Sequence, residues 1–325
     1  MIYLETGSLD PCYNLAFEEF VLSNRRDDDY LLLWQNENTV VVGQNQNPLE
    51  EIDPDFVARH GIRVVRRITG GGAVYHDLGN LNFSLITDAE DPELLTMELF
   101  TAPVVEALRE LGVPAEVSGR NDIVVEGQKI SGTAQCVRDG RILFHGTLLF
   151  DSDPEMLSGA LRADPEKFSS KSSKSVRSRV GNIRTYLNED MDLPAFRTHL
   201  RRSFVGEAPA KQLTPVELSR LQKLKEEKYD TWDWTYGRSP QYETTYRRRW
   251  DGGTLAVSLT VDRGILAGIA FRGDFLSLKD PAEVETALRG IPYREESVAA
   301  VLDRFSLREY FGSITADELL QTIFP

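Results

Sequence analysis

Three consecutive glycines, Gly70 to Gly72, stand between two short apolar runs and directly after Arg66 and Arg67. A run without side chains favours a turn with positive φ or a backbone that lies close against a ligand. Successive N–H groups in such a turn can converge on an anion, and an arginine can add a bidentate contact to a phosphate or a carboxylate. No acidic residue occurs between Val57 and His76, although the chain carries a formal net charge of −14. This stretch therefore predicts either an anion-binding turn or a plain hairpin turn, and alone it does not decide between them.

A few other side chains have types that do chemistry. Lys129 stands beside Gly132, where the missing side chain would admit a ligand, although a lysine at a strand end is usually a solvated charge. Cys136 and His145 fall in alternating strands, where a buried and inert thiol or a structural imidazole is the usual outcome. His76 has no second His or Cys at metal-ligand spacing, so we predict no zinc site.

A second basic stretch runs from Lys167 to Arg184 and contains six Lys and Arg residues and no acidic one. It is rich in serine and lacks hydrophobic periodicity, which predicts a loop. Three interpretations remain open for it: a solvated loop, a patch that docks an acidic protein, and a lid over an anionic ligand. We favour the lid because the rest of the chain is so acidic.

The composition sets limits on the class of protein. The chain has 325 residues, 41 % of them apolar, which is enough for a large domain and a smaller one. The negative net charge argues against nucleic-acid partners and against a membrane surface. Only two cysteines are present, so we expect no disulfide framework and a cytoplasmic location.

The elements that must position these residues follow from periodicity. We expect helices over 14–26, 54–59, 92–111, 194–204 and 215–229, with at least one of Glu18 and Glu19 on a solvated face. Asp53 is the expected N-cap of the second of these helices, and Thr214 with Glu217 has the pattern of a capping box at the start of the last. Segments 30–34 and 39–43 read as a hairpin, and Asp139-Gly140 is a two-residue hairpin turn. The fold class is α+β, with a mostly antiparallel sheet flanked by helices in residues 1–240 and a small α+β domain of three strands and two or three helices in residues 241–325.

Together these motifs resemble the lipoate–protein ligases of the A type, within the biotin and lipoate ligase superfamily. The resemblance covers nearly the whole chain and is carried by NLAFEE at 14–19, TVVVGQNQNP at 39–48, RRITGGGAVYHDLGNLNFS at 66–84, SGRNDIVV at 118–125, KISGTA at 129–134, HGTLLF at 145–150 and SVRSRVGNI at 175–183. It departs slightly from the family pattern, since Ile68-Thr69 stands where Ser-Ser is common and Tyr75 where Phe is common.

The resemblance implies a two-step reaction: lipoate and Mg-ATP form lipoyl-AMP and pyrophosphate, and a lysine of an acceptor domain then takes the lipoyl group. It implies that Lys129 is catalytic and that Asp122 orients Lys129 or binds Mg²⁺. The implied ATP-binding residues are Arg67, Gly72, Ala73, Val74, Tyr75, Asp122 and Lys129. The implied lipoate-binding residues are Arg67, Gly71, Gly72, His76, Lys129 and Gly132, and the loop over the adenylate would use Arg177 and Val180. The implied acceptors are the glycine-cleavage H protein and E2 subunits of 2-oxoacid dehydrogenases, and octanoate is an alternative acyl substrate.

Two other hypotheses remain. An ATP-independent lipoyl or octanoyl amidotransferase would need a cysteine thioester near Lys129, but simple alternation places Cys136 on the opposite strand face unless a bulge intervenes. A non-catalytic lipoyl-domain binder would not need Arg67 and Lys129 beside a complete glycine turn. Neither alternative predicts release of pyrophosphate from ATP and lipoate.

Overall fold

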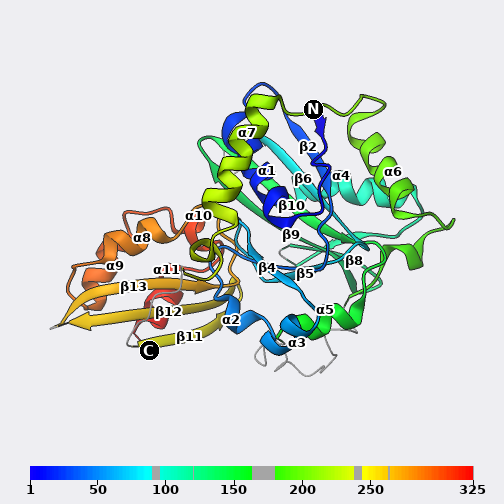
Figure 1. The fold of residues 1–325 in the computed structure, drawn as a ribbon. Helices are drawn as coiled ribbons and strands as arrows, with labels where there is room; N and C mark the ends of the chain where they lie inside the picture. Colours follow the sequence, from blue (N-terminus) through cyan, green and yellow to red (C-terminus); the bar gives the residue numbers. More distant parts are fainter. Residues whose placement is uncertain (90–95, 120, 163–179, 238–243, 263, 325) are drawn as a thin grey trace.

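The computed structural model describes residues 1–89, 96–119, 121–162, 180–237, 244–262 and 264–324. A seven-stranded sheet forms the middle of the larger body, in the order β1-β2-β6-β10-β9-β8-β7 (Figure 1). All neighbouring strands are antiparallel except β1 and β2. The predicted α+β class is therefore confirmed. The strands are β1 (Ile2–Leu4), β2 (Tyr30–Trp34), β6 (Asn80–Asp88), β7 (Glu116–Ser118), β8 (Asp122–Val125), β9 (Gln128–Arg138) and β10 (Arg141–Leu149).

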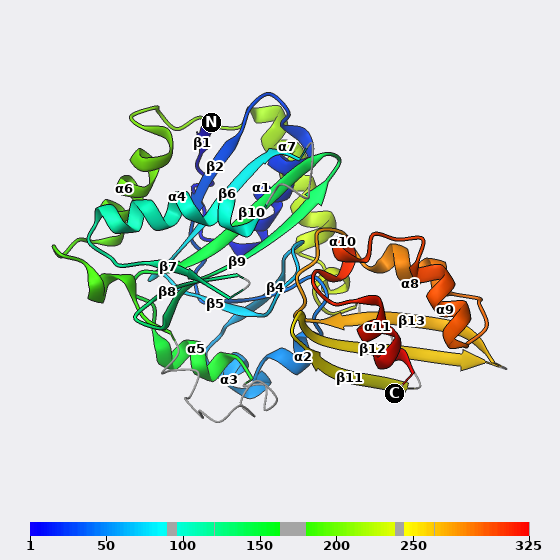
Figure 2. The same cartoon turned by 180° about the vertical axis from the view of Figure 1, so that it is seen from behind.

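Helices cover both faces of this sheet (Figure 2). Helices α4 (Met97–Glu110) and α6 (Leu193–Val205) pack on one face, whereas α1 (Pro11–Asn24) and α7 (Pro215–Leu224), with its continuation to Tyr229, pack on the other. Strand β2 reads YLLLW without alternation because alternate residues enter the two cores: Leu31 and Leu33 face α4, and Leu32 and Trp34 face α1. A strand buried on both faces has no solvated side to occupy with polar residues.

A second, three-stranded sheet has the order β4-β3-β5, with β3 (Thr39–Val42) between β4 (Arg63–Arg66) and β5 (Val74–His76). The predicted hairpin between 30–34 and 39–43 is wrong, because β2 pairs with β1 and β6 while β3 pairs with β4 and β5. The polar segment between them crosses from one sheet to the other, and Asn36 in this segment is fully buried. Helices α2 (Pro48–Glu51), α3 (Pro54–Arg59, capped by Asp53 as predicted) and α5 (Pro154–Ala160) lie beside this sheet.

The C-terminal region has its own sheet and its own core (Figure 1). The three predicted strands are β11 (Thr244–Trp250), β12 (Gly253–Asp262) and β13 (Ile265–Gly273). Within the described residues there are four helices rather than two or three: α8 (Ala282–Leu288), α9 (Glu295–Leu302), α10 (Leu307–Phe311) and α11 (Ala316–Ile323). The predicted boundary at 240/241 falls outside the described residues.

Helix α1 contains the main error in predicted exposure. Glu18 and Glu19 are both buried, with 1 % and 7 % of their surface exposed, because α1 lies between the sheet and α7. The Glu19 carboxylate accepts hydrogen bonds from Arg138, Lys228 and Tyr229. Burial by itself raises the pKa of Glu19, but the positive charges of Lys228 and Arg138 outweigh it and the pKa lies below its ordinary value.

Candidate active site

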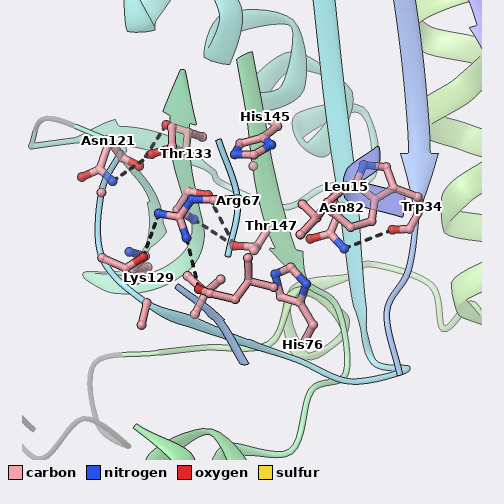
Figure 3. A pocket seen from close by; sticks show the side chains of 18 residues that line it. Leu15, Trp34, Arg67, His76, Asn82, Asn121, Lys129, Thr133, His145 and Thr147 are labelled. Atoms are coloured by element: carbon pink, nitrogen blue, oxygen red, sulfur yellow. Dashed lines mark hydrogen bonds between the residues drawn. The ribbon is translucent and has the colours of Figure 1, made fainter. Parts of the chain in front are cut away.

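A pocket lies between the two sheets of the larger body and collects most of the residues predicted from the sequence (Figure 3). Lys129 lies toward one end and Trp34, Leu15 and Asn82 toward the other, with Arg67 between them. The predicted residues that line the pocket are Arg67, Gly71, Gly72, Ala73, Val74, His76, Lys129 and Gly132. Tyr75 does not line it, because its side chain is buried on the other face of β5 and its hydroxyl donates to Asn38. Sequence reasoning did not single out four further lining residues, which only the fold brings together: Trp34, Asn82, Asn121 and Thr147.

The glycine turn connects β4 to β5 on either side of β3, so it is not a hairpin turn. Gly71 has a φ of +86°, which favours glycine. A side chain on Gly43, at the end of β3, would overlap the carbonyl oxygen of Gly71, so two glycines allow the backbones to touch. The N–H of Gly71 donates to the carbonyl oxygen of Phe275 at 3.2 Å, so the C-terminal region contacts this turn directly.

Arg66 supports the fold around the pocket. Its side chain is 1 % exposed, and its guanidinium donates to five backbone carbonyls, those of Gly43, Gln44, Gln46, Trp234 and Thr235. These bonds tie the end of β3 to the segment that leads to the C-terminal region. All three nitrogens of this buried guanidinium donate to backbone carbonyls, so the side chain is committed to the protein and does not serve as the anion-binding fork.

Arg67 lines the pocket and organises the glycine turn. Its Nε donates to Thr69 Oγ1 at 2.9 Å, and its terminal nitrogens donate to the carbonyl oxygens of Val41, Gly70 and Gly72 at 3.1, 2.6 and 2.8 Å. Burial lowers the pKa of Arg67 to about 10, and the nearby charge of Glu18 opposes this shift. These four bonds leave one N–H of the guanidinium, and the predicted contact of Arg67 with phosphate would use it.

Lys129 presents its ammonium group at the pocket wall. Its Nζ lies 2.7 Å from Asp122 Oδ1, and each of the two side chains is 35 % exposed. A methyl group on Gly132 would lie 2.8 Å from Nζ, so glycine at this position makes room for the ammonium. The backbone of Lys129 also pairs with Val180, which places this predicted loop residue beside it. Arg177 and most of the basic stretch 167–184 lie outside the described residues.

Cys136 shares a strand face with Lys129, which corrects the prediction from alternation. The register between β8 and β9 shifts because Ile123 pairs with Ser131 whereas Val124 pairs with Lys129. Ile130 is therefore an extra residue in β9, and it turns the Lys129 side chain onto the strand face of Gly132. Alternation then continues from Gly132 to Cys136. Cys136 is nevertheless only 4 % exposed and does not line the pocket, and burial raises its pKa to about 12. Its burial, not its strand face, disfavours a thioester.

His76 enters the pocket as a neutral ring with a fixed proton. Asn14 Nδ2 donates to Asn36 Oδ1, so Asn36 Nδ2 must be the donor toward His76 Nδ1, at 3.1 Å. Burial, with a contribution from the positive charge of Arg67, lowers the pKa of His76 to about 3. The ring proton is therefore on Nε2, which is buried and has no hydrogen-bond partner within the described part of the chain. His76 can donate a hydrogen bond to a ligand, but it has no free lone pair with which to act as a base.

Asp122 is the one carboxylate proposed for magnesium. The described residues contain no group of three or more His, Cys, Asp or Glu side chains that could hold a metal ion on their own. Asp122 does not itself line the pocket, but its Oδ1 lies 2.7 Å from the Nζ of Lys129, which does. Mg²⁺ usually binds through one or two carboxylates together with substrate phosphates, so a single carboxylate beside the pocket fits a metal that arrives with a nucleotide.

Comparisons with known proteins identify the family of this chain. The family model described as "Lipoyl protein ligase A/B catalytic domain" matches residues 10–205, and that described as "Bacterial lipoate protein ligase C-terminus" matches residues 239–323. The chain is 42 % identical to the lipoate-protein ligase LplJ of Bacillus subtilis, and the alignment covers 100 % of each chain.

Two solved structures are similar as well. A bipartite lipoate protein ligase of Thermoplasma acidophilum, reported with its E2 lipoyl domain, is 33 % identical and has a TM-score of 0.66 over 75 % of this chain and 98 % of the other. A lipoate-protein ligase A bound with ATP is 30 % identical and has a TM-score of 0.63 over 73 % of this chain and 97 % of the other. Within the described residues, no helix is both long and apolar enough to cross a membrane.

Proposed function

This chain belongs to the lipoyl protein ligase A/B family, and on that premise we propose that it is an ATP-dependent lipoate–protein ligase that acts on lipoyl domains. The observation that carries the proposal is the position of the Lys129 ammonium, which faces the glycine turn across one pocket and is given room by Gly132. A carboxylate and a phosphate repel each other, and a fixed positive charge between them is what their reaction requires.

In the first step, a carboxylate oxygen of lipoate attacks the α-phosphorus of ATP, and the bond to the bridging oxygen of pyrophosphate breaks. Lys129 offsets the repulsion between the two anions and stabilises the charge that develops in the transition state. The glycine turn would hold the nucleotide with the backbone N–H groups of Gly72, Ala73 and Val74, because the N–H of Gly71 is already bonded to Phe275. Tyr75 supports this segment from the core.

ATP would bring Mg²⁺ to the site as the Mg-ATP complex. Asp122 is the side chain that would contribute a ligand oxygen, and the phosphates would complete the coordination. The metal would neutralise charge on pyrophosphate as it leaves. Lys129 pairs with Asp122 at 2.7 Å, and that carboxylate would hold the ammonium at the pocket wall until the substrates bind.

The lipoyl chain extends from Lys129 toward Leu15 and Trp34, which give the far end of the pocket its apolar surface. His76 lies next to Trp34, with ring centroids 6.1 Å apart, and directs its Nε2 proton to the bound acyl group. Gly71 and Gly132 have no side chains, so the lipoyl chain can contact their backbone directly. The apolar contacts fit octanoate as well as lipoate.

In the second step, the amine of an acceptor lysine attacks the carbonyl carbon of lipoyl-AMP, an amide forms, and AMP leaves. The acceptors are lipoyl domains, such as those of the H protein and of E2 subunits. Val180, which pairs with Lys129, would contact the adenylate, and the role of Arg177 rests on the family resemblance alone. The cytoplasmic location is also a proposal, and it rests on the two unpaired cysteines and on the ATP that the reaction uses.

The whole reaction is tested with the full chain, lipoate, ATP, Mg²⁺ and a purified lipoyl domain in its unmodified form. Mass spectrometry should show the domain gaining one lipoyl group at one lysine, with AMP formed in equal amount. The gain should vanish without ATP. Modification that proceeds from a lipoyl or octanoyl carrier protein without ATP would contradict the proposal and favour the amidotransferase.

A further inference from the structure

A buried chain of hydrogen bonds leads from Arg67 into the core. Arg67 Nε donates to Thr69 Oγ1 at 2.9 Å, Thr69 Oγ1 lies 2.8 Å from His145 Nε2, and His145 Nδ1 lies 2.9 Å from Glu18 Oε1. Thr69 is 0 % exposed and Glu18 1 %. The chain joins the glycine turn to the seven-stranded sheet and to helix α1, which are separate elements of the fold.

The direction of the protons follows from the atoms available. Thr69 Oγ1 accepts a hydrogen bond from Arg67, and the Thr69 hydroxyl then donates its single proton in a hydrogen bond to His145 Nε2. His145 Nδ1 accordingly carries the ring proton and donates a hydrogen bond to Glu18 Oε1. Glu18 Oε1 also accepts from Ser84 Oγ at 2.6 Å. With this assignment each bond in the chain has one donor and one acceptor, and the chain ends on a carboxylate charge.

The Arg67 end of this hydrogen-bond network sets the shape of the glycine turn. Because Thr69 fixes Nε, it fixes the plane of the Arg67 guanidinium, whose NH2 group bonds the carbonyl oxygens of Gly70 and Gly72. These two carbonyls flank Gly71, the residue with positive φ. The buried Glu18 charge also favours the positive form of Arg67.

A hydroxyl, an imidazole and a carboxylate that are hydrogen-bonded in this order also form catalytic triads. Thr69, however, is not placed to act as a nucleophile. Its oxygen accepts a hydrogen bond from a cationic guanidinium, which withdraws electron density. Its side chain has no exposed surface and is not among the residues that line the pocket.

We propose that Thr69, His145 and Glu18 are positioning residues that hold Arg67 and the glycine turn in the conformation that binds the triphosphate. This proposal rests on the proposed ligase function. It assigns a task to the buried Glu18–His145 pair, which the two-step reaction otherwise leaves unused.

The test measures lipoate-dependent exchange of labelled pyrophosphate into ATP as a function of ATP concentration. Thr69→Val keeps the shape and removes the hydroxyl, and we expect the KM for ATP to rise about tenfold or more because two buried partners lose their bond. Thr69→Ser restores the hydroxyl and should stay within about threefold of wild type. The matched control is Thr101→Val in α4, which removes a buried hydroxyl that donates to Met97 and has no part in the chain; its KM for ATP should equal that of wild type.

Glu18→Gln gives an independent readout, because it keeps the atoms in place and removes the charge. It should also raise the KM for ATP, and in the double variant with Thr69→Val the two effects should be clearly less than additive. If Thr69→Val does not fold, the comparison of Glu18→Gln with wild type decides the matter alone. Wild type without exchange would refute the ligase function itself. Exchange in wild type together with an unchanged KM in these variants, or with fully additive effects, would overturn the positioning proposal and leave the ligase function standing.

Discussion

Gly132→Ala should separate catalysis from stability. The new methyl group would lie 2.8 Å from Lys129 Nζ and 2.9 Å from its Cε, and no backbone atom is among its nearest neighbours. The lysine is a flexible side chain with 35 % of its surface exposed, so it can move away without disturbing the core. The fold should survive while the ammonium leaves its position.

The size of the effect follows from the geometry. Ordinary contact begins near 3.4 Å, so Nζ must move by at least 3.4 − 2.8 = 0.6 Å, which also disturbs its ion pair with Asp122. A displacement of about 1 Å in a catalytic group can cost about 100-fold in rate. We therefore expect adenylation to fall by about 10- to 100-fold, or about 1.4–2.7 kcal/mol of transition-state stabilisation, while the free energy of unfolding changes by less than about 1 kcal/mol.

The assay is initial-rate pyrophosphate exchange, together with urea unfolding of the same preparations. Gly159→Ala is the matched control, because its methyl group would overlap the ring of Phe56 between α5 and α3, away from Lys129. It should lose stability and keep its activity per folded molecule. Wild-type exchange in Gly132→Ala would refute the assignment of Lys129 to the reacting phosphate.

Three further predictions concern groups around the pocket. Arg66→Met should lower the free energy of unfolding by at least about 3 kcal/mol, since buried carbonyls lose their donor; urea unfolding measures this, and an unchanged midpoint would contradict the structural role. Cys136→Ala should keep both adenylation and transfer within about threefold, because a buried thiol with a pKa raised to about 12 is not a nucleophile at neutral pH; loss of transfer alone would revive the thioester hypothesis. Glu19, whose pKa in the folded protein is held below its ordinary value of 4.5 by Lys228 and Arg138, contributes stability that is present above that value and is lost as pH falls through the folded pKa. The stability difference between wild type and Glu19→Gln should therefore shrink when urea unfolding is repeated below about pH 4.5, and a difference independent of pH would show that the charge contributes nothing.

Local signals in the sequence predicted elements and caps well. Asp53-Pro54 and Thr214-Pro215 begin helices as expected, and the Thr214 and Glu217 side chains form the predicted capping box. Asp139 and Gly140 both have positive φ and join β9 to β10. These features depend on neighbours in the chain, so a single sequence contains the information.

Predictions failed where the outcome depends on partners far away in the chain. The short polar turn after β2 is typical of a hairpin, but strand pairing is decided by the whole sheet, and β3 finds its partners in β4 and β5. Glu18 and Glu19 gave no sign of burial, because their partners His145 and Lys228 come from strand β10 and from the segment after α7. The register shift near Lys129 could not be predicted by counting residues, since alternation assumes an unbroken strand.

The site shows the same division. The glycine run and the positive charges identified Gly70–Gly72, Arg67 and Lys129 as candidates. Leu15 and Trp34, at the apolar end of the pocket, could not be distinguished in the sequence from ordinary core residues. The roles of Arg66 and Arg67 also could not be separated by sequence, because both are buried and only their acceptors differ.

The central claim is that Lys129 supports the attack of a carboxylate on ATP. Its most direct test is lipoate-dependent exchange of labelled pyrophosphate into ATP, measured side by side for wild type and Lys129→Ala at saturating substrates. We predict exchange in wild type and a loss of at least about 100-fold in a folded Lys129→Ala protein. Equal exchange in both proteins would contradict the role of Lys129, and no exchange in a folded wild type that binds lipoate would contradict adenylation itself.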